Sequence, residues 1–289
     1  MPTVSGKFAD LPGRGIRLHY RDWGGSGETL LLLHGLSSNS RIWDLTAPLL
    51  TNRFRVVALD QRGHGLSDGP HDGYGFDDVS ADLSALMDTL KLDRLVLVGH
   101  SWGASVALHF AASRPDAARA LVMVDGGFIE LSQRMPWEEA ERVMRPPDID
   151  GTPVETFVGF MKKWPQFRDT WSEELADMVL SNFDVREGKI YRRLTIPNHM
   201  KIARALYNLN AGEFLARLPC PALVISCHRE PTNPAEREWQ SHRSEALARL
   251  KEAAPSVRMQ VMEDTIHDVP VQRPNELAAA IRSFVDQSR

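Results

Sequence analysis

Cysteine is scarce in this sequence, which has only Cys220 and Cys227 among its 289 residues. The two cysteines bracket a predicted strand, and seven steps of ~3.3 Å along an extended chain would place them ~23 Å apart. A disulfide requires Cα atoms within ~7 Å, so we expect two free thiols and no disulfide-stabilised fold. A cytoplasmic location is therefore the default expectation.

Long apolar runs and an excess of one charge are missing as well. The absence of any run of ~18 apolar residues argues against a membrane span, and residues 1–7 lack the apolar core of a signal peptide. With 34 basic and 38 acidic residues the formal net charge is −4, which gives no reason to expect nucleic acid as a partner. The remaining composition is typical of a globular protein with one large α/β domain or two domains.

The strongest motif is the stretch 96–104, which reads VLVGHSWGA. Apolar residues before Gly99 indicate a strand, and apolar residues at helical spacing follow Gly103. Gly-x-Ser-x-Gly between a strand and a helix is the signature of a nucleophile elbow, a turn so sharp that its serine is strained. A Cβ at either glycine would collide with the neighbouring strand or helix. The motif thus predicts that Ser101 lies at a helix N-terminus, where negative charge is favoured.

Strands alternate with helices along much of the chain. Strands are predicted at 7–9, 16–23, 29–33, 54–59, 95–98, 120–124, 221–226 and 257–262, and long helices at 76–90 and 235–250. The glycine-rich stretch 24–27 is interpreted as a hairpin turn. The alternation predicts a parallel, doubly wound sheet that binds its ligand at the carboxyl ends of its strands. His34, Ser101 and Asp125 each follow such an end.

Residues 131–212 have a different pattern. They contain no convincing strand, and prolines interrupt their short helical stretches. Tryptophan, phenylalanine and methionine are frequent in this segment, which suggests a pocket suited to an apolar substrate.

A strand that ends in His34-Gly35 is followed further along the chain by the Gly-x-Ser-x-Gly elbow. This combination resembles the α/β-hydrolase family. The resemblance implies an eight-stranded, mostly parallel sheet. It also implies that the backbone N–H groups of Leu36 and Trp102 form an oxyanion hole. Gly35 would let the backbone approach the substrate closely, and we interpret His34 as a side chain that braces this loop by hydrogen bonds.

The resemblance further implies a division of the chain. Residues 131–212 would form a helical cap over the active site, inserted into a core domain made of residues 1–130 and 213–289. The sequence is more similar to esterases, lactonases and carbon–carbon-bond hydrolases than to dehalogenases or epoxide hydrolases. Those last two groups use an aspartate where this chain has Ser101.

The family's catalytic histidine corresponds in position to His267, which follows the last predicted strand and precedes Pro274. A serine hydroxyl needs a neutral imidazole to accept its proton and a carboxylate to orient that imidazole. The family often has glycines just before this histidine. In this chain Asp264 and Ile266 occupy those places.

Two acidic residues compete for the third role in the triad. Asp125 directly follows the strand after the elbow, whereas Glu230 follows the next strand, where most of the family carries its acid. Both loops lie at the same edge of the predicted sheet, so either carboxylate could reach the histidine. We favour Asp125 because a buried strand fixes it, while Arg229 and Arg237 are rival partners for Glu230. The alternative stays open.

These observations predict a serine hydrolase that cleaves an ester, thioester or lactone of a largely apolar small molecule through an acyl-enzyme on Ser101. The alternatives are hydrolysis of a carbon–carbon or amide bond, and a ligand-binding protein that keeps the triad with little turnover. No cofactor is expected. The cluster Asp60, His64, Asp68 and His71 lacks the i, i+4 spacing of a His-Glu-x-x-His zinc site, so we expect no metal either. The sequence does not distinguish a monomer from a homodimer.

Overall fold

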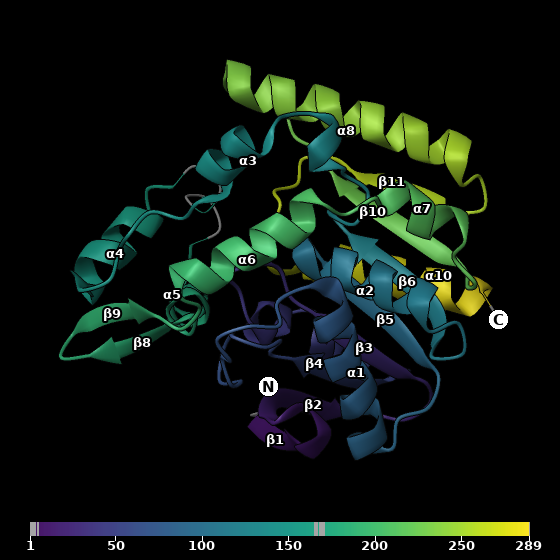
Figure 1. The fold of residues 1–289 in the computed structure, drawn as a ribbon, viewed down its shortest axis with the longest axis horizontal. Helices are drawn as coiled ribbons and strands as arrows, with labels where there is room; N and C mark the ends of the chain where they lie inside the picture. The colour runs from purple at the N-terminus through teal and green to yellow at the C-terminus, as the bar shows by residue number, and fades with distance from the viewer. Residues whose placement is uncertain (1–3, 5, 165–166, 168–170, 289) are drawn as a thin grey trace.

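The computed structural model describes residues 4, 6–164, 167 and 171–288. Its centre is an eight-stranded sheet with the order β1-β2-β4-β3-β5-β6-β10-β11 (Figure 1). The strands are β1 (Gly6–Leu11), β2 (Ile16–Gly24), β3 (Thr29–Leu33), β4 (Arg55–Leu59), β5 (Leu95–His100), β6 (Ala118–Val124), β10 (Ala222–Cys227) and β11 (Arg258–Met262). Within this sheet, the β1–β2 and β2–β4 pairs are antiparallel and the other pairs are parallel. The predicted eight-stranded, mostly parallel sheet is therefore confirmed.

Helices cover both faces of this sheet because its central strands are apolar on both sides. Within β3, Leu31 and Leu33 pack into one hydrophobic core, while Leu30 and Leu32 pack into the other. The first core is covered by α1 (Phe76–Leu90), α2 (Trp102–Ser113), α7 (Ala211–Ala216) and α8 (Pro234–Ala253). The second is covered by η2 (Ser40–Trp43), η3 (Ala47–Leu50), α9 (Val269–Gln272) and α10 (Pro274–Gln287). Figure 1 shows α1 and α2 in front of the sheet and α10 behind it.

Two predictions near the N-terminus have different outcomes. The short 3-10 helix η1 (Pro12–Arg14) joins β1 to β2, which form the expected antiparallel pair. The interpretation of the stretch 24–27 as a hairpin turn is wrong, because β4 lies between β2 and β3 in the sheet. The glycines instead let this segment pass close to the backbone just before β4. A Cβ on Gly25 would lie 2.0 Å from the carbonyl oxygen of Phe54.

The segment 131–212 contains both helices and strands. Its elements are η4 (Leu131–Gln133), α3 (Trp137–Met144), β7 (Thr152–Pro153), α4 (Val154–Met161), α5 (Glu173–Leu180), β8 (Phe183–Arg186), β9 (Lys189–Arg192) and α6 (Ile196–Tyr207). The expectation of no strand here is wrong, since β7, β9 and β8 form a small antiparallel sheet. The signal was the pair Glu187-Gly188, which turns β8 into β9 with positive φ at both residues.

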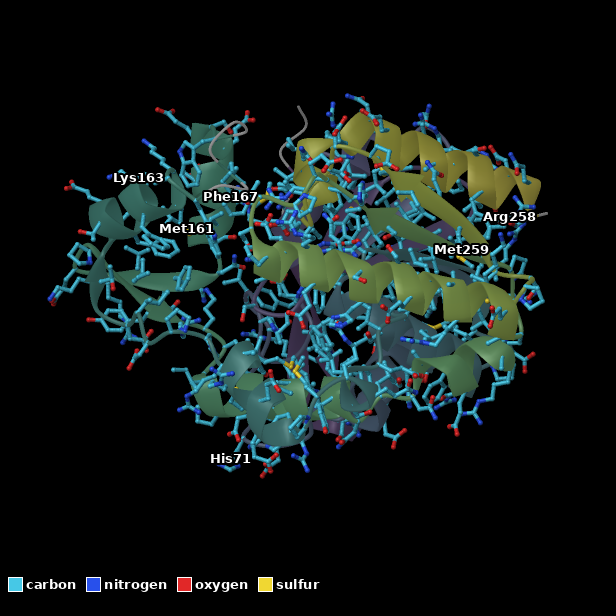
Figure 2. All side chains as sticks on the ribbon, turned by 90° about the horizontal axis from the view of Figure 1, so that it is seen from above. His71, Met161, Lys163, Phe167, Arg258 and Met259 are labelled. Carbon is cyan, nitrogen blue, oxygen red and sulfur yellow. The ribbon has the colours of Figure 1, made fainter. Side chains whose placement is uncertain are left out.

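Many of the apolar side chains of this segment pack against one another. Phe157, Met161 and Ile190 belong to a third hydrophobic cluster, separate from the two cores beside the large sheet. Its α4, β8 and β9 lie at one end of the molecule (Figure 1), and Figure 2 places Met161 and Lys163 at the end opposite Arg258 of β11. Phe157, Phe167, Trp171 and Phe183 of the sequence pattern thus belong to an internal core of this segment, whereas Phe160 and Trp164 are exposed.

Cys220 and Cys227 are both buried and free, as expected. Among the helices of the described ranges, none combines the length and apolarity needed to cross a membrane.

Candidate active site

Ser101 lies in the turn between β5 and α2, with φ 54° and ψ −119°. This is the strained conformation that the motif predicts for a nucleophile elbow. The flanking glycines are required by close contacts. A Cβ on Gly99 would lie 2.2 Å from the carbonyl oxygen of Gly103, and a Cβ on Gly103 would lie 2.4 Å from that of Leu33. The turn therefore presents the Ser101 hydroxyl at the carboxyl end of the sheet, and no described residue forms a hydrogen bond with it.

The loop after β3 runs directly beside Ser101. A Cβ on Gly35 would lie 3.0 Å from Cβ and 3.5 Å from Oγ of the serine, so a larger residue would press against Ser101. Trp102 is the first residue of α2, where backbone N–H groups have no intrahelical acceptor. No hydrogen bond among the described residues uses the backbone N–H of Leu36 or of Trp102. Both N–H groups therefore have no acceptor among the described residues, and their role as oxyanion donors stays a prediction.

His34 is fully buried and forms a hydrogen bond with the loop that follows β3. Its Nδ1 donates to the carbonyl oxygen of Gly35 at 2.7 Å, and its Nε2 accepts from the backbone N–H of Gln61 at 3.0 Å. Burial lowers the pKa of His34, which keeps the ring neutral. Both ring nitrogens of His34 are therefore engaged in hydrogen bonds to the backbone of the loops after β3 and β4.

The structure brings His267 and Asp125 together from two different loops. Nδ1 of His267 donates to Oδ2 of Asp125 at 2.6 Å, although 142 positions separate the two residues. Asp125 follows β6 with φ 51°, and its side chain is completely buried. The His267 side chain is 44% exposed. With Nδ1 bound to the carboxylate, the neutral imidazole has its lone pair on Nε2, the nitrogen free to accept a proton.

The electrostatics of this pair reinforce its geometry. Burial would raise the pKa of Asp125, but the hydrogen bond and charge of His267, together with Arg243, hold it well below its usual range. Desolvation of the part-exposed ring would lower the pKa of His267, but the hydrogen bond and charge of Asp125 outweigh this effect, so the pKa stands above its usual value. The carboxylate is therefore ionised at neutral pH and favours the imidazolium that a proton transfer would form.

Glu230, the alternative acid, lies away from this pair. The residue is exposed, and none of the described residues forms an ion pair or hydrogen bond with its carboxylate. Arg229 pairs with Glu236 at 2.9 Å and leaves Glu230 in solvent. Of the two candidate acids, only Asp125 contacts His267.

The loop before His267 accommodates its departures from the family pattern. Asp264 takes a left-handed conformation with φ 55°, which aspartate tolerates better than most residues. Ile266 is buried in the hydrophobic cluster of the 131–212 segment, and its backbone N–H donates to Oε1 of Gln272 at 2.7 Å. Side-chain packing and this hydrogen bond thus fix the loop before His267.

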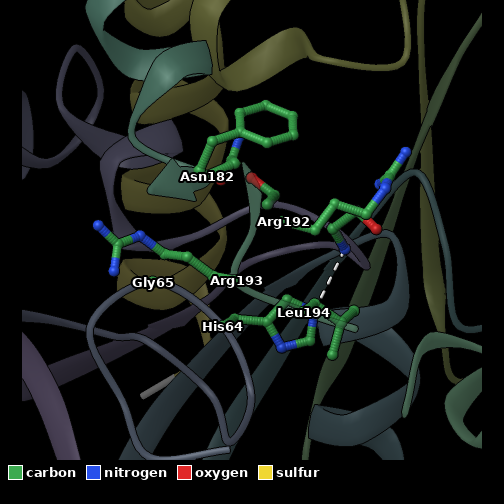
Figure 3. Close-up of a pocket in the computed structure, with 9 residues that line it drawn as sticks. His64, Gly65, Asn182, Arg192, Arg193 and Leu194 are labelled. Carbon is green, nitrogen blue, oxygen red and sulfur yellow. Dashed lines mark hydrogen bonds between the residues drawn. The ribbon is translucent and has the colours of Figure 1, made fainter. Parts of the chain in front are cut away.

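A small pocket of about 50 Å³ opens where the loops after β3 and β4 meet the 131–212 segment (Figure 3), and Ser101, Asp125 and His267 are not among its lining residues. Its floor includes Ser37 and Ser38, which follow the predicted oxyanion residue Leu36, and His64. The backbone N–H of Ser37 donates to Nε2 of His64 at 3.2 Å. The residues that line the pocket are Ser37, Ser38, His64, Gly65, Asn182, Phe183, Arg192, Arg193 and Leu194. Figure 3 shows the two arginine side chains pointing in different directions.

A second depression lies far from Ser101 on the surface of the protein. This shallower depression of about 500 Å³ adjoins Cys220 and Arg258, at the amino ends of β10 and β11 and so at the opposite edge of the sheet. Across the described ranges, no three histidine, cysteine or acidic side chains are grouped to hold a metal ion. The candidate site is therefore the cluster around Ser101, His267 and Asp125.

Sequence reasoning missed a side chain of helix α8 that contacts this cluster directly. Arg243 of α8 pairs with Asp125 through both of its terminal nitrogens. A signal for it was present, because Arg243, Ala246 and Leu250 share one face of α8 at helical spacing, and the other two are buried. A charged residue on the apolar face of a helix indicates a buried partner.

The fold and this site define the class of protein. A family profile described as alpha/beta hydrolase fold matches residues 28–274, and the chain belongs to this family. The solved structure of E-2-(acetamidomethylene)succinate hydrolase superimposes with a TM-score of 0.79, at 24% identity, over 98% of this chain and 100% of that one. That likeness shows the fold.

Two relatives with assigned activities are similar in sequence. The 2-(acetamidomethylene)succinate hydrolase of Mesorhizobium japonicum is 44% identical over 110 residues, which span 38% of this chain and 39% of that protein. The N-formylmaleamate deformylase of Pseudomonas putida is 26% identical over 287 residues, 96% of each protein. Both relatives are hydrolases.

Proposed function

We propose that this protein is a serine hydrolase that cleaves an ester, thioester or lactone of a small molecule through an acyl-enzyme on Ser101. The observation that carries the proposal is the 2.6 Å contact between Nδ1 of His267 and Asp125, formed beside a serine in an elbow turn. A serine alone would be a weak nucleophile at neutral pH.

In the proposed reaction, Nε2 of His267 takes the hydroxyl proton of Ser101 while Oγ attacks the acyl carbon. The carbonyl oxygen gains negative charge, and the backbone N–H groups of Leu36 and Trp102 donate to it. The imidazolium then returns its proton to the leaving alcohol, thiol or amine as the bond to the acyl carbon breaks. A water molecule, deprotonated by the same imidazole, releases the acid and restores the free serine.

The carboxylate of Asp125 has two roles in this scheme. It accepts from Nδ1, which fixes the tautomer that leaves Nε2 as the proton acceptor, and its negative charge stabilises the imidazolium. Its complete burial strengthens both effects because solvent screens the interaction poorly there.

The substrate in this proposal is a small, largely apolar acyl compound that enters below the 131–212 segment, which acts as a cap. Phe183 and Leu194 of that segment line the small pocket opposite Ser37 and Ser38. Since Gly35 of the same loop lies against Ser101, an acyl group bound to the serine would extend toward this pocket.

Amide hydrolysis is the second candidate. It is favoured by the deformylase of Pseudomonas putida, whose similarity covers 96% of this chain. The same residues would perform it, with an amine as the leaving group that receives the proton from His267. A substrate panel must therefore include N-formyl and N-acetyl compounds beside nitrophenyl esters and lactones.

The test is active-site labelling with a fluorophosphonate followed by mass spectrometry. The proposal predicts one phosphonyl group on Ser101, with no labelling of Ser101→Ala and a loss of turnover on the order of 10⁴–10⁶-fold. Normal turnover in Ser101→Ala would refute the mechanism. Labelling with a single turnover and no steady-state rate on any panel member would instead identify a ligand-binding protein.

A further inference from the structure

We propose that Arg243 is a positioning residue, which fixes the Asp125 carboxylate toward His267 and offsets part of its negative charge. The inference rests on the proposed function, since it assigns to Asp125 and His267 the roles given above. It adds a fourth side chain, from helix α8, that touches neither the serine nor the substrate.

The geometry is that of an arginine fork on a carboxylate. Nη1 of Arg243 donates to Oδ2 of Asp125 at 3.1 Å, and Nη2 donates to Oδ1 in a very short contact. Nη2 also donates to Oγ of Ser226 at 2.9 Å, which orients the guanidinium. The Arg243 side chain is only 12% exposed. Such two-point recognition fixes the plane of a carboxylate as well as its position.

The hydrogen bonds of Asp125 leave its carboxylate no freedom to rotate. Oδ1 accepts from the backbone N–H of Cys227 at 2.8 Å and from Arg243, while Oδ2 accepts from Arg243 and His267. Each oxygen therefore has two donors, which matches its two lone pairs. Without Arg243, two of these four bonds disappear, and a buried carboxylate is left with unused acceptors.

The charges around His267 give Arg243 a second effect. Asp125 and Asp268 favour the imidazolium, Arg243 opposes it, and His100 packs against the ring with a centroid distance of 4.7 Å. Burial lowers the pKa of His100 to about 4, so His100 contributes no charge at neutral pH. Arg243 is thus the one cation among these neighbours, and its removal would let His267 hold its proton more tightly.

The inference has a measurable consequence in the pH dependence of kcat/KM. Arg243→Gln keeps a hydrogen-bonding side chain but removes the charge, so the acidic midpoint of the profile should move upward by about one pH unit. Arg243→Lys keeps the charge without the fork, so its midpoint should stay near that of the wild type while kcat falls about tenfold. A residue that only supports the fold would lower the rate at every pH without moving the midpoint.

Arg237→Gln is the matched control, because Arg237 lies on the same helix, is exposed, and has no side-chain partner among the described residues. It should leave the profile unchanged. An unmoved or lowered midpoint in Arg243→Gln would overturn the inference. If that variant fails to fold, a shifted midpoint in Arg243→Lys would overturn it equally. Fluorophosphonate labelling of the wild type and of Ser101→Ala is measured in parallel. If labelling is lost in Ser101→Ala while the midpoint of Arg243→Gln is unmoved, the role of Arg243 is wrong and the proposed function still holds.

Discussion

His100 donates from Nε2 to the backbone carbonyl oxygen of His267 at 2.8 Å. The ring is buried, and Nδ1 has no hydrogen-bond partner within the described part of the chain. Since His100 immediately precedes Ser101, this single bond ties the elbow turn to the loop that carries the proposed base. The tether acts on the backbone of His267, whereas Asp125 acts on its ring.

The first prediction concerns this tether. His100→Phe should fill the same space but leave the carbonyl oxygen of His267 without its donor. We expect this loss to destabilise the present conformation of the His267 loop by about 1–3 kcal/mol. We expect kcat to fall about tenfold with no movement of the pH midpoint, because neutral His100 supplies no charge. Steady-state kinetics across the pH range measure both quantities. An unchanged kcat would show that the tether is dispensable.

The second prediction distinguishes the two candidate acids. Asp125→Asn keeps the size of the side chain but removes the carboxylate that orients His267, and an equivalent change in a serine protease lowers kcat ~10⁴-fold. We expect a loss of three to four orders of magnitude from Asp125→Asn. The matched variant Glu230→Gln should lose less than about tenfold, because no described residue bonds to that side chain. The reverse pattern would move the acid to Glu230.

The third prediction concerns pH. His267 must be neutral to accept a proton, and Asp125 raises its pKa above the ordinary 6.5. Protonation therefore persists to a higher pH than in a free histidine, and kcat/KM should fall as the pH drops through a midpoint above 6.5. In Asp125→Asn this midpoint should move down, although the rate is low. A midpoint near 4 in the wild type would point to a carboxylate as the base.

The fourth prediction tests the packing of the elbow. Gly103→Ala would place a methyl group 2.4 Å from the carbonyl oxygen of Leu33, and backbone cannot move aside as a flexible side chain can. We expect a loss of about 1–3 kcal/mol in the free energy of unfolding, measured by urea titration. Gly159→Ala is the control, since nothing lies within 4 Å of its added methyl group and alanine favours the helix α4. That variant should be as stable as the wild type or more so.

The fifth prediction concerns the acyl group. Each buried methylene contributes ~0.8 kcal/mol, so kcat/KM for nitrophenyl esters should rise roughly fourfold per carbon until the pocket is filled. Because the pocket beside Ser37 measures about 50 Å³, we expect the rise to end within the short chains, between propionate and hexanoate. A flat profile from acetate to octanoate would show that the acyl group does not enter it.

Much of the fold was predictable because its signals are local. The continuous apolar run that forms β3 and the 3- and 4-residue spacing of α1 each mark one element, and the elbow residues Gly99, Ser101 and Gly103 mark one turn. These features depend on neighbours within a few residues, so the sequence alone determines them. The hairpin of β8 and β9 escaped notice because strands of four residues show little alternation.

The partners of the candidate site were not predictable in the same way. Asp125 and Glu230 follow neighbouring strands at one edge of the sheet, and only the directions of their side chains distinguish them. Arg243 reaches Asp125 across 118 positions of the chain, through a helix whose tilt the sequence does not reveal. Which side chains meet depends on tertiary packing, and a single sequence carries no direct record of it.

The residue next to the proposed base belongs to the core of another part of the molecule. Ile266 packs with Phe157 and Ile190, although neither of them supplies a reacting group. Exchange of residues 131–212 for the corresponding segment of a relative would therefore displace the loop of His267. A chimaera should therefore take residue 266 from the same relative as the transplanted segment. If only residues 131–212 are exchanged, Ile266 is separated from the hydrophobic cluster in which it packs.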